Sequence, residues 1–304
     1  MIYTLTLNTA VDMNIFSAPL QPGKVNRTQH TEYCPNGKGV NVSLVLNHFD
    51  TPSHIFGIFG GFTGRYIVEE IRKRRIGITP TWVADPTRIN VFIHDGQQEY
   101  KLVNPGTWID DESKQKILHH LQSVQAGDHL VISGSLPPGL ESLFYTEILA
   151  LCSQKGCEVI LDISHASLRQ LLEFQPLLIK PNEDELFEIF GLQADTPEQI
   201  KTAVATLHQL GARHVLLTLG ARGMVFSDGT TRWFCAAPDI QLVSSACAGD
   251  AALAAFLSVW LAGGKVNDAL TLASATGADV AASAGLGQFN RLEQLRTQTQ
   301  VVTL

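Results

Sequence analysis

The last two-thirds of the chain alternates between apolar segments with the length of strands and longer segments with the spacing of helices. Strands are predicted at about 129–133, 158–163, 177–180 and 214–219, and helical segments separate them. Strands that are joined through helices run parallel, and parallel strands that are buried on both faces are apolar throughout. The pattern therefore predicts an α/β fold with a mostly parallel sheet that helices cover on both faces.

The composition excludes several classes of protein. The 304 residues are 45% hydrophobic and 17% charged, which is enough for a large core and argues against disorder. A net charge of −7 gives no support for nucleic-acid binding. The sequence has no apolar run of the roughly 18 residues that a membrane span requires, and it begins without a basic leader. We therefore expect no nucleic-acid partner, no membrane span and no signal peptide.

The cysteines indicate the redox compartment. They are odd in number and lack the spacing of metal ligands, so we expect reduced thiols in a cytoplasmic protein. The five are Cys34, Cys152, Cys157, Cys235 and Cys247.

A loop of small residues, 244–249, precedes Asp250 and an apolar helical stripe. A helix N-terminus offers free backbone N–H groups and the positive end of the helix dipole, and both favour an anion. Asp250 could accept a proton beside such an anion, or it could simply cap the helix, which is a common use of Asp. The stretch alone leaves both interpretations open. The stripe consists of Leu253, Phe256, Leu257, Trp260 and Leu261.

Gly37, Lys38 and Gly39 lie just before another apolar helical segment. Glycines let the backbone approach a ligand closely, and a lysine supplies a positive charge. The motif suits an anion or a polyol, although it lacks the spacing of a Walker A loop. On its own, an ordinary glycine-rich turn explains such a stretch more often.

Two segments depart from the strand and helix alternation. Residues 14–34 are turn-rich and fit an excursion better than a core element, and residues 87–104 alternate around an Asp-Gly hairpin signal. Arg88 and Asn90 share one face of the predicted strand, so Arg88 could point at a phosphate with Asn90 beside it. A solvated strand face is the alternative.

Polar residues recur where the predicted strands end. The first strand, over Ile2–Leu7, ends at the segment 8–12, which contains Asp12. In open α/β sheets, ligands bind at the carboxyl edge of the strands, so these residues are candidates for a binding site. Further candidates at that edge are Ser135, Lys180, Asn182, Glu185, Gly220 and Gly223.

Together these motifs resemble those of the ribokinase-like sugar kinases of the phosphofructokinase B family. The branch that contains 1-phosphofructokinase and tagatose-6-phosphate kinase is the most similar. Any one motif is weak evidence, but their occurrence in the family's order outweighs the simpler explanations given above. The motifs are Thr6–Asp12, Gly37-Lys38-Gly39 with Asn41, Thr87–Val91, Ser133–Gly139, Lys180–Glu185, Leu219–Gly223 and Ala248–Asp250.

The resemblance implies a ribokinase-like three-layer α/β/α fold with a mostly parallel central sheet, in a single kinase domain over residues 1–304. The excursions at about 14–34 and 87–104 would form a small β-sheet lid that closes and excludes water. The resemblance also implies a homodimer that pairs through the lid.

For the acceptor side, the resemblance implies that Asp250 is the catalytic base. Cys247, Ala248 and Gly249 would form the loop before it, and the N–H groups of Ala248, Gly249 and Asp250 would stabilise the transferring phosphoryl group. Lys38 and Arg88 would fix the phosphate that the substrate already carries. The residues expected to bind the substrate are Asp12, Gly37, Lys38, Gly39, Asn41, Arg88, Asn90, Ser135 and Asp250.

For the donor side, the resemblance implies ATP and Mg²⁺ as cofactors. Asn182 and Glu185 would hold the metal through water. The residues expected to bind ATP are Lys180, Asn182, Glu185, Thr218, Gly220, Gly223, Ser245, Ala248 and Gly249.

Two positions depart from the family's usual pattern. Asn36 stands where Gly is common, and this position is expected to be tolerant. Cys247 stands in a loop that usually reads Gly-Ala-Gly-Asp, and a cysteine with positive φ would be strained by roughly 1–2 kcal/mol. Its side chain could also crowd the transferring phosphate, although burial would make the thiol inert.

The expected reaction is ATP-dependent phosphorylation of a ketose phosphate, with fructose 1-phosphate, giving fructose 1,6-bisphosphate, as the first candidate. Tagatose 6-phosphate, giving tagatose 1,6-bisphosphate, is the alternative. An unphosphorylated sugar or a nucleoside fits less well, because Lys38 and Arg88 would then lack an anion. A third possibility is a sugar-phosphate-binding protein in which Cys247 has impaired catalysis, and the presence of Asp250, Asn182 and Glu185 argues against it.

Overall fold

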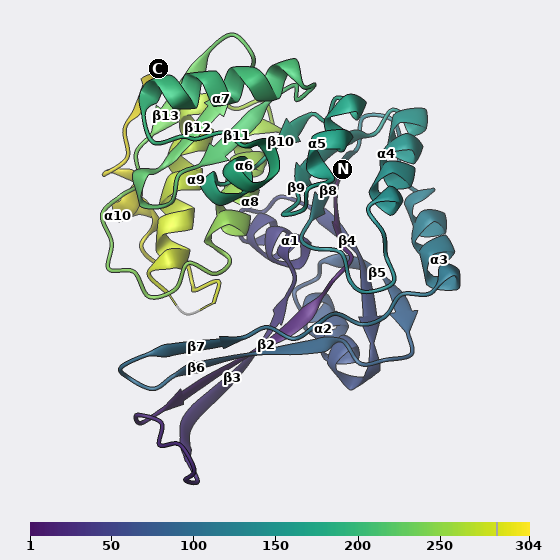
Figure 1. The fold of residues 1–304 in the computed structure, drawn as a ribbon, viewed down its shortest axis with the longest axis vertical. Helices are drawn as coiled ribbons and strands as arrows, with labels where there is room; N and C mark the ends of the chain where they lie inside the picture. The colour runs from purple at the N-terminus through teal and green to yellow at the C-terminus, as the bar shows by residue number, and fades with distance from the viewer. Residues whose placement is uncertain (284) are drawn as a thin grey trace.

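The computed structural model describes residues 1–283 and 285–304 and contains a large sheet and a small one (Figure 1). The large sheet has ten strands in the order β14-β13-β12-β11-β10-β9-β8-β1-β4-β5. Neighbouring strands from β5 to β11 run parallel, and those from β11 to β14 run antiparallel. Their bounds are β1 Ile2–Thr6, β4 Ser53–Gly60, β5 Gly77–Val83, β8 His129–Ser133, β9 Glu158–Asp162, β10 Leu178–Ile179, β11 Val215–Thr218, β12 Met224–Ser227, β13 Arg232–Cys235 and β14 Val301–Thr303. The predicted mostly parallel sheet is confirmed.

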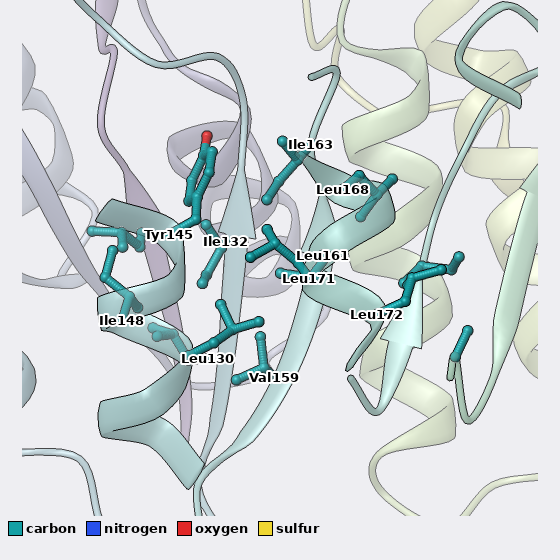
Figure 2. Packing of buried hydrophobic residues seen from close by; sticks show 14 of the residues in the cluster. Leu130, Ile132, Tyr145, Ile148, Val159, Leu161, Ile163, Leu168, Leu171 and Leu172 are labelled. Atoms are coloured by element: carbon teal, nitrogen blue, oxygen red, sulfur yellow. The ribbon is translucent and has the colours of Figure 1, made fainter. Parts of the chain in front are cut away.

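Helices cover both faces of the large sheet, as the apolar strands predict. Alternate residues of a strand point to opposite faces, so Leu130 and Ile132 pack into one core and Val131 into another. The first core includes side chains of α3 (Asp111–Leu121), α4 (Leu143–Lys155), α5 (Leu168–Leu171), α6 (Glu183–Phe190) and α7 (Pro197–Gln209). Figure 2 shows this core, where Leu130, Ile132, Val159 and Leu161 of the strands meet Tyr145, Ile148, Leu168 and Leu171 of the helices.

The opposite face packs against a second group of helices. Side chains of α1 (Lys38–His48), α8 (Ala248–Trp260) and α9 (Val266–Ala281) fill the core there. A smaller cluster joins α2 (Gly61–Lys73) to β4, and α10 (Leu292–Arg296) packs on α9. The result is the expected three-layer α/β/α arrangement.

The two excursions form one four-stranded sheet, which extends away from the helices that cover the main sheet (Figure 1). We call this sheet the lid. Its order is β3-β2-β6-β7, with bounds β2 Ala10–Ser17, β3 Thr28–Asn36, β6 Arg88–His94 and β7 Glu99–Leu102. The sheet includes strands from both excursions, and β2 begins at Ala10, before the start expected at about residue 14. Asp12 therefore lies inside β2, where it pairs with Cys34 and Asn90.

Gly37 joins the lid to the main body, because it follows β3 and precedes the first residue of α1. Its φ of 137° is one that other residues rarely adopt. A Cβ at this position would also lie 2.6 Å from Cγ2 of Thr6. Glycine is therefore required here by the backbone as well as by the contact with β1.

Replacing Gly37 with Ala is expected to reduce the free energy of unfolding by roughly 2–4 kcal/mol, because backbone strain and the clash add. Urea denaturation measures the loss. Gly263→Ala is the matched control, since Gly263 also has a positive φ of 79° but has no heavy atom within 4 Å of the added Cβ. An equal loss in both variants would contradict the contribution of the Thr6 contact.

Candidate active site

Asp250 lies in the first turn of α8 and is buried. The Nδ2 atom of Asn41, on α1, donates a hydrogen bond of 2.9 Å to its Oδ2. Burial raises the pKa of Asp250 to about 6, repulsion from Asp162 adds to the increase, and Lys38 opposes it. The cap position is taken by Cys247, so Asp250 is not the N-cap of this helix. A buried carboxyl with a pKa near neutrality is suited to accepting a proton.

The start of α8 has the features of an anion site. The N–H groups of Gly249 and Asp250 lie in the first turn, where helix geometry supplies no acceptor within the helix. The N–H of Ala248 makes only a long contact of 3.4 Å with the carbonyl oxygen of Ser245. These three donors and the helix dipole favour a negative group beside Asp250.

Cys247 has the left-handed backbone that its loop was expected to require, with φ of 63° and ψ of −9°. Its Sγ accepts a hydrogen bond of 3.3 Å from Nδ2 of Asn41. Burial raises the pKa of the thiol well above its usual value, and the nearby Asp250 raises it further. The thiol therefore stays protonated, which agrees with the expectation of an unreactive side chain.

Lys38 and Lys180 lie on either side of the fully buried Asp162, at the end of β9. Their Nζ atoms are 3.3 Å and 3.1 Å from Oδ1 of Asp162. Burial alone would raise the pKa of Asp162, but the attraction of the two lysines outweighs it and holds that pKa below its usual value. Lys38 is also 3.8 Å from Glu185, and these carboxylates raise its pKa despite its burial. Lys38 is thus held as a cation, and Lys180 contacts the same carboxylate oxygen.

The contacts of Lys38 and Arg88 bear on one expectation from the sequence, which stays a prediction. Lys38 and Arg88 were expected to grip the substrate's phosphate together. The Lys38 ammonium instead contacts Asp162, Glu185 and the hydroxyl of Ser164, whereas Arg88 donates to the backbone carbonyls of Asn8 and Asn104. The two cations share no hydrogen-bond partner among the described residues, because the start of α1 directs Lys38 toward the end of β9.

Asn182 and Glu185 form a capping box at the start of α6. Oδ1 of Asn182 accepts from the N–H of Glu185 at 2.7 Å, and Oε2 of Glu185 accepts from the N–H of Asn182 at 3.0 Å. The other carboxylate oxygen of Glu185 accepts from the hydroxyl of Ser164. The sequence pattern that suggested a metal site is therefore also a helix cap.

The donor set around Glu185 fits Mg²⁺ only in part. Within residues 1–283 and 285–304, no group of three or more His, Cys, Asp or Glu could enclose a metal ion. Oδ2 of the buried Asp162 has no hydrogen-bond partner among these residues. Mg²⁺ usually keeps several waters and binds to one or two carboxylates together with substrate phosphates. The oxygens present fit that mode of binding and not a cage built by protein alone.

Asp12, Asn36, Asn41 and Asn90 form a hydrogen-bonded row at the base of the lid. Asn90 and Asn36 both donate to the carboxylate of Asp12, and burial raises the pKa of Asp12 against the effect of these bonds. Oδ1 of Asn41 and Oδ1 of Asn90 are buried with no hydrogen-bond partner among the described residues. Asp12, Asn36, Asn41 and Cys247 line a cavity of about 850 Å³. The polar side chains around this cavity, among them Asn41 with its unpaired Oδ1, suit the hydroxyl groups of a polyol.

Arg88 and Ser135 lie on a second cavity, of about 690 Å³, together with Asn8, Ser164 and His165. Nδ2 of Asn8 donates to Oγ of Ser135 at 3.1 Å. Nε of Arg88 is buried and has no hydrogen-bond partner among the described residues. A guanidinium, a hydroxyl and an imidazole around one cavity suit a phosphate.

The residues expected on the nucleotide side lie along the ends of β10 and β11. Nζ of Lys180 is so close to the start of α8 that a Cβ on Gly249 would lie 3.4 Å from it. Thr218 forms a β-bridge with Asn182, and Gly220 begins the 3₁₀ turn after β11. Gly223 has a φ of 114°, and a Cβ at this position would lie 2.0 Å from the backbone carbonyl oxygen of Cys235 on β13. Ser245 is exposed in the loop before α8.

Asp162 and Ser164 were missed in the sequence. Asp162 ends an otherwise apolar strand, and a carboxylate at the carboxyl end of a buried strand is a signal for a site. Ser164 gave no signal, because its partners Lys38 and Glu185 lie far from it in sequence.

The comparisons with known proteins agree with this geometry. The model of the pfkB family of carbohydrate kinases matches residues 6–291. The chain is 67% identical to D-tagatose-1-phosphate kinase of Klebsiella oxytoca and 38% identical to the Bacillus licheniformis protein of the same name. It is 34% identical to 1-phosphofructokinase of Bacillus subtilis, and each of these matches covers 100% of both chains.

Among solved structures, phosphofructokinase-2 from Escherichia coli in complex with substrates and products has a TM-score of 0.91, over 97% of this chain and 98% of that one. At 24% identity this match supports the fold alone. The fold, the site and these matches define a phosphotransferase with an alcohol group as acceptor. The chain belongs to the pfkB family of carbohydrate kinases. No helix in the described part of the chain is long and apolar enough to span a membrane.

Replacing Asp250 with Asn is expected to lower turnover by about 10²- to 10⁴-fold, because the amide cannot accept the proton. In the wild-type protein, the pKa of the Asp250 carboxyl is about 6 and lies above the unperturbed value of 3.8. The ionised carboxylate therefore opposes folding at pH 7. The melting temperature of Asp250→Asn should therefore rise, and calorimetry measures it. Asp268→Asn, at an exposed position on α9, is the control for turnover and should leave it unchanged.

The pH dependence of kcat/KM provides a test of the charge cluster. Turnover should fall as pH drops through about 6, where Asp250 becomes protonated. Asp162→Asn removes the repulsion that raises this pKa, so the acid limb should move to lower pH. A substrate phosphate also titrates near pH 6, but it does so identically in both proteins, so the difference between the two profiles isolates Asp250. Superimposable profiles would contradict the coupling.

Proposed function

We propose that this protein is an ATP-dependent kinase of a ketose 1-phosphate, with tagatose 1-phosphate as the first candidate and fructose 1-phosphate as the second. The observation that carries a phosphoryl-transfer function is the buried Asp250 beside the N-terminus of α8 and the two lysines. The tagatose compound ranks first because the 67% identical relative is a D-tagatose-1-phosphate kinase. Tagatose 6-phosphate ranks third.

In the proposed reaction, Asp250 takes the proton from the hydroxyl on C6 of the sugar. The hydroxyl oxygen then bonds to the γ-phosphorus of ATP, and the bond from that phosphorus to the bridging oxygen breaks, which releases ADP. The N–H groups of Ala248, Gly249 and Asp250 stabilise the charge on the transferring group. Lys180 lies close enough to Gly249 to add a positive charge there.

The remaining groups orient the two substrates. Asp12, Asn41 and Asn90 accept hydrogen bonds from the sugar hydroxyls, and Arg88 with Ser135 binds the phosphate that the sugar already carries. Mg²⁺, held through water by Asn182 and Glu185, neutralises charge on the ATP phosphates when it is bound. Orientation of the reactants accounts for much of the rate in such a reaction.

The lid is proposed to close over the sugar and exclude water, and to pair with the lid of a second copy in a homodimer. The exposed side chains of Tyr33, Tyr100 and Leu102 on its strands support such a contact. Size-exclusion chromatography with light scattering measures the oligomeric state.

The substrate is tested by ADP release with Mg-ATP on a panel of acceptors. Tagatose 1-phosphate is expected to give the highest kcat/KM, followed by fructose 1-phosphate and then by the two ketose 6-phosphates, with free tagatose lowest. Phosphorus NMR should identify a 1,6-bisphosphate as the product. Equal or faster turnover of free tagatose would contradict the proposal.

Arg88→Met should raise KM for tagatose 1-phosphate by about 10- to 100-fold, because a charge-assisted bond to phosphate is lost. The same variant should leave turnover of free tagatose nearly unchanged. Arg213→Met is the control, since Arg213 pairs with Glu158 at the start of β9, away from the carboxyl ends of the strands. A loss that is equal for both acceptors would remove Arg88 from phosphate binding.

The alternative of a sugar-phosphate-binding protein with impaired catalysis makes a different prediction. If Cys247 disables the anion site, the wild-type protein should bind sugar phosphate without turnover, and Cys247→Gly should restore turnover. The thiol's hydrogen bond from Asn41, on the sugar side of the loop, favours an active enzyme.

A further inference from the structure

Asn36 occupies the junction between the lid and the main body. It is the last residue of β3, and Gly37 and α1 follow directly. The sequence suggested that this position is tolerant, but the structure places its carboxamide between two groups of the proposed sugar site. Its Nδ2 donates to Oδ2 of Asp12 on the lid, and its Oδ1 accepts from Nδ2 of Asn41 at 2.8 Å.

The orientation of this carboxamide is fixed from three sides. The backbone N–H of Gly37 donates to Oδ1 at 2.5 Å, and Asn41 donates to the same oxygen, so the amide nitrogen must face the acceptor on Asp12. A flipped carboxamide would place its oxygen against the Asp12 carboxylate and its nitrogen against two donors. Asn36 therefore has one favourable orientation.

Asn41 extends this connection to the proposed base. Its Nδ2 carries two hydrogens and has three acceptors within reach, which are Oδ1 of Asn36 at 2.8 Å, Oδ2 of Asp250 at 2.9 Å and Sγ of Cys247 at 3.3 Å. The two oxygens are the nearer and stronger acceptors. The bond to Asn36 thus fixes the side chain that holds Asp250.

A continuous hydrogen-bonded path results, from Asn90 and Asp12 on the lid through Asn36 and Asn41 to Asp250. We propose that Asn36 is a positioning residue that couples the lid carboxylate Asp12 to the orientation of the base Asp250. It acts through these two side chains and not on the reacting atoms. The kinetic part of this inference rests on the proposed function, because it takes Asp12 as a sugar-binding group.

Two substitutions separate the two halves of the path. Asn36→Asp keeps an acceptor for Gly37 and Asn41 but replaces the amide donor with a second carboxyl that repels Asp12. KM for the sugar phosphate should therefore rise about tenfold, with kcat within about threefold of wild type. Asn36→Ala removes both halves, so kcat should also fall by about tenfold. KM for ATP should stay within about twofold in both, since the path does not reach the nucleotide side. A general loss of structure would not raise KM alone in one variant and change both KM and kcat in the other.

The wild-type protein is assayed first with tagatose 1-phosphate and fructose 1-phosphate, and thermal melting checks that each variant folds. The proposal is overturned if Asn36→Ala keeps kcat and KM within twofold of wild type, or if the Asp and Ala variants lose kcat equally.

A substrate-free measurement distinguishes failure of this inference from failure of the proposed function. If the wild type turns over neither sugar, the proposed function fails, and the coupling is then measured by urea denaturation. Asp12→Ala and Asn41→Ala should be non-additive in unfolding free energy when Asn36 is present and additive in the Asn36→Ala background. Additivity in both backgrounds overturns the coupling.

Discussion

The site depends on one buried charge cluster, in which Asp162 lies between the ammonium groups of Lys38 and Lys180. A fully buried carboxylate is costly unless it is paired, and the buried ammonium group of Lys180 is equally costly without it. The cluster brings the start of α1, the end of β9 and the segment after β10 to one point. The ammonium group of Lys38 is partly exposed and can meet a phosphate, while Asp162 raises the pKa of Asp250 by repulsion. In the proposed reaction, this one ion cluster therefore attracts the phosphates of ATP. It also sets the basicity of Asp250.

The parallel sheet explains why these groups meet. The carboxyl ends of β9, β10 and β11 lie along one edge of the large sheet. The helices α1 and α8, which pack together on one face of that sheet, begin near this edge. The lid then adds Asp12, Arg88 and Asn90 from strands that belong to a separate sheet. In the proposed reaction, the main body holds the groups that act on the transferring phosphoryl group, and the lid supplies most of those that contact the sugar. Such a division makes catalysis dependent on the contacts between the two sheets, among which the row from Asp12 to Asn41 is prominent.

Much of the fold was predictable because apolar strands and helical stripes are local patterns. Strand 129–133 was predicted with its observed bounds, and both lid excursions were located. Asp250 and the anion site at α8 were also accessible, since a small-residue loop before a buried helix is visible in sequence. Asp162, the partner of Lys38, was not visible in the sequence, because it lies 124 residues away. The pairing depends on which strand end lies opposite the start of α1. The same limit applies to Asn36, whose bonds join three elements that become neighbours only in the folded chain, and to Asp12, whose strand is defined by pairing with β3 and β6.

Cys247 shows how a local penalty is tolerated at such a site. A left-handed backbone at a residue other than glycine costs roughly 1–2 kcal/mol. Here the side chain packs partly against the core that contains α8 and accepts a hydrogen bond from Asn41, so both its apolar and its polar character are used. Such contacts, worth about 1 kcal/mol, offset much of the strain. Because the thiol is the more distant of the three acceptors around Asn41, it supports that side chain without displacing it from Asp250. The cysteine is therefore compatible with the geometry on which the base depends.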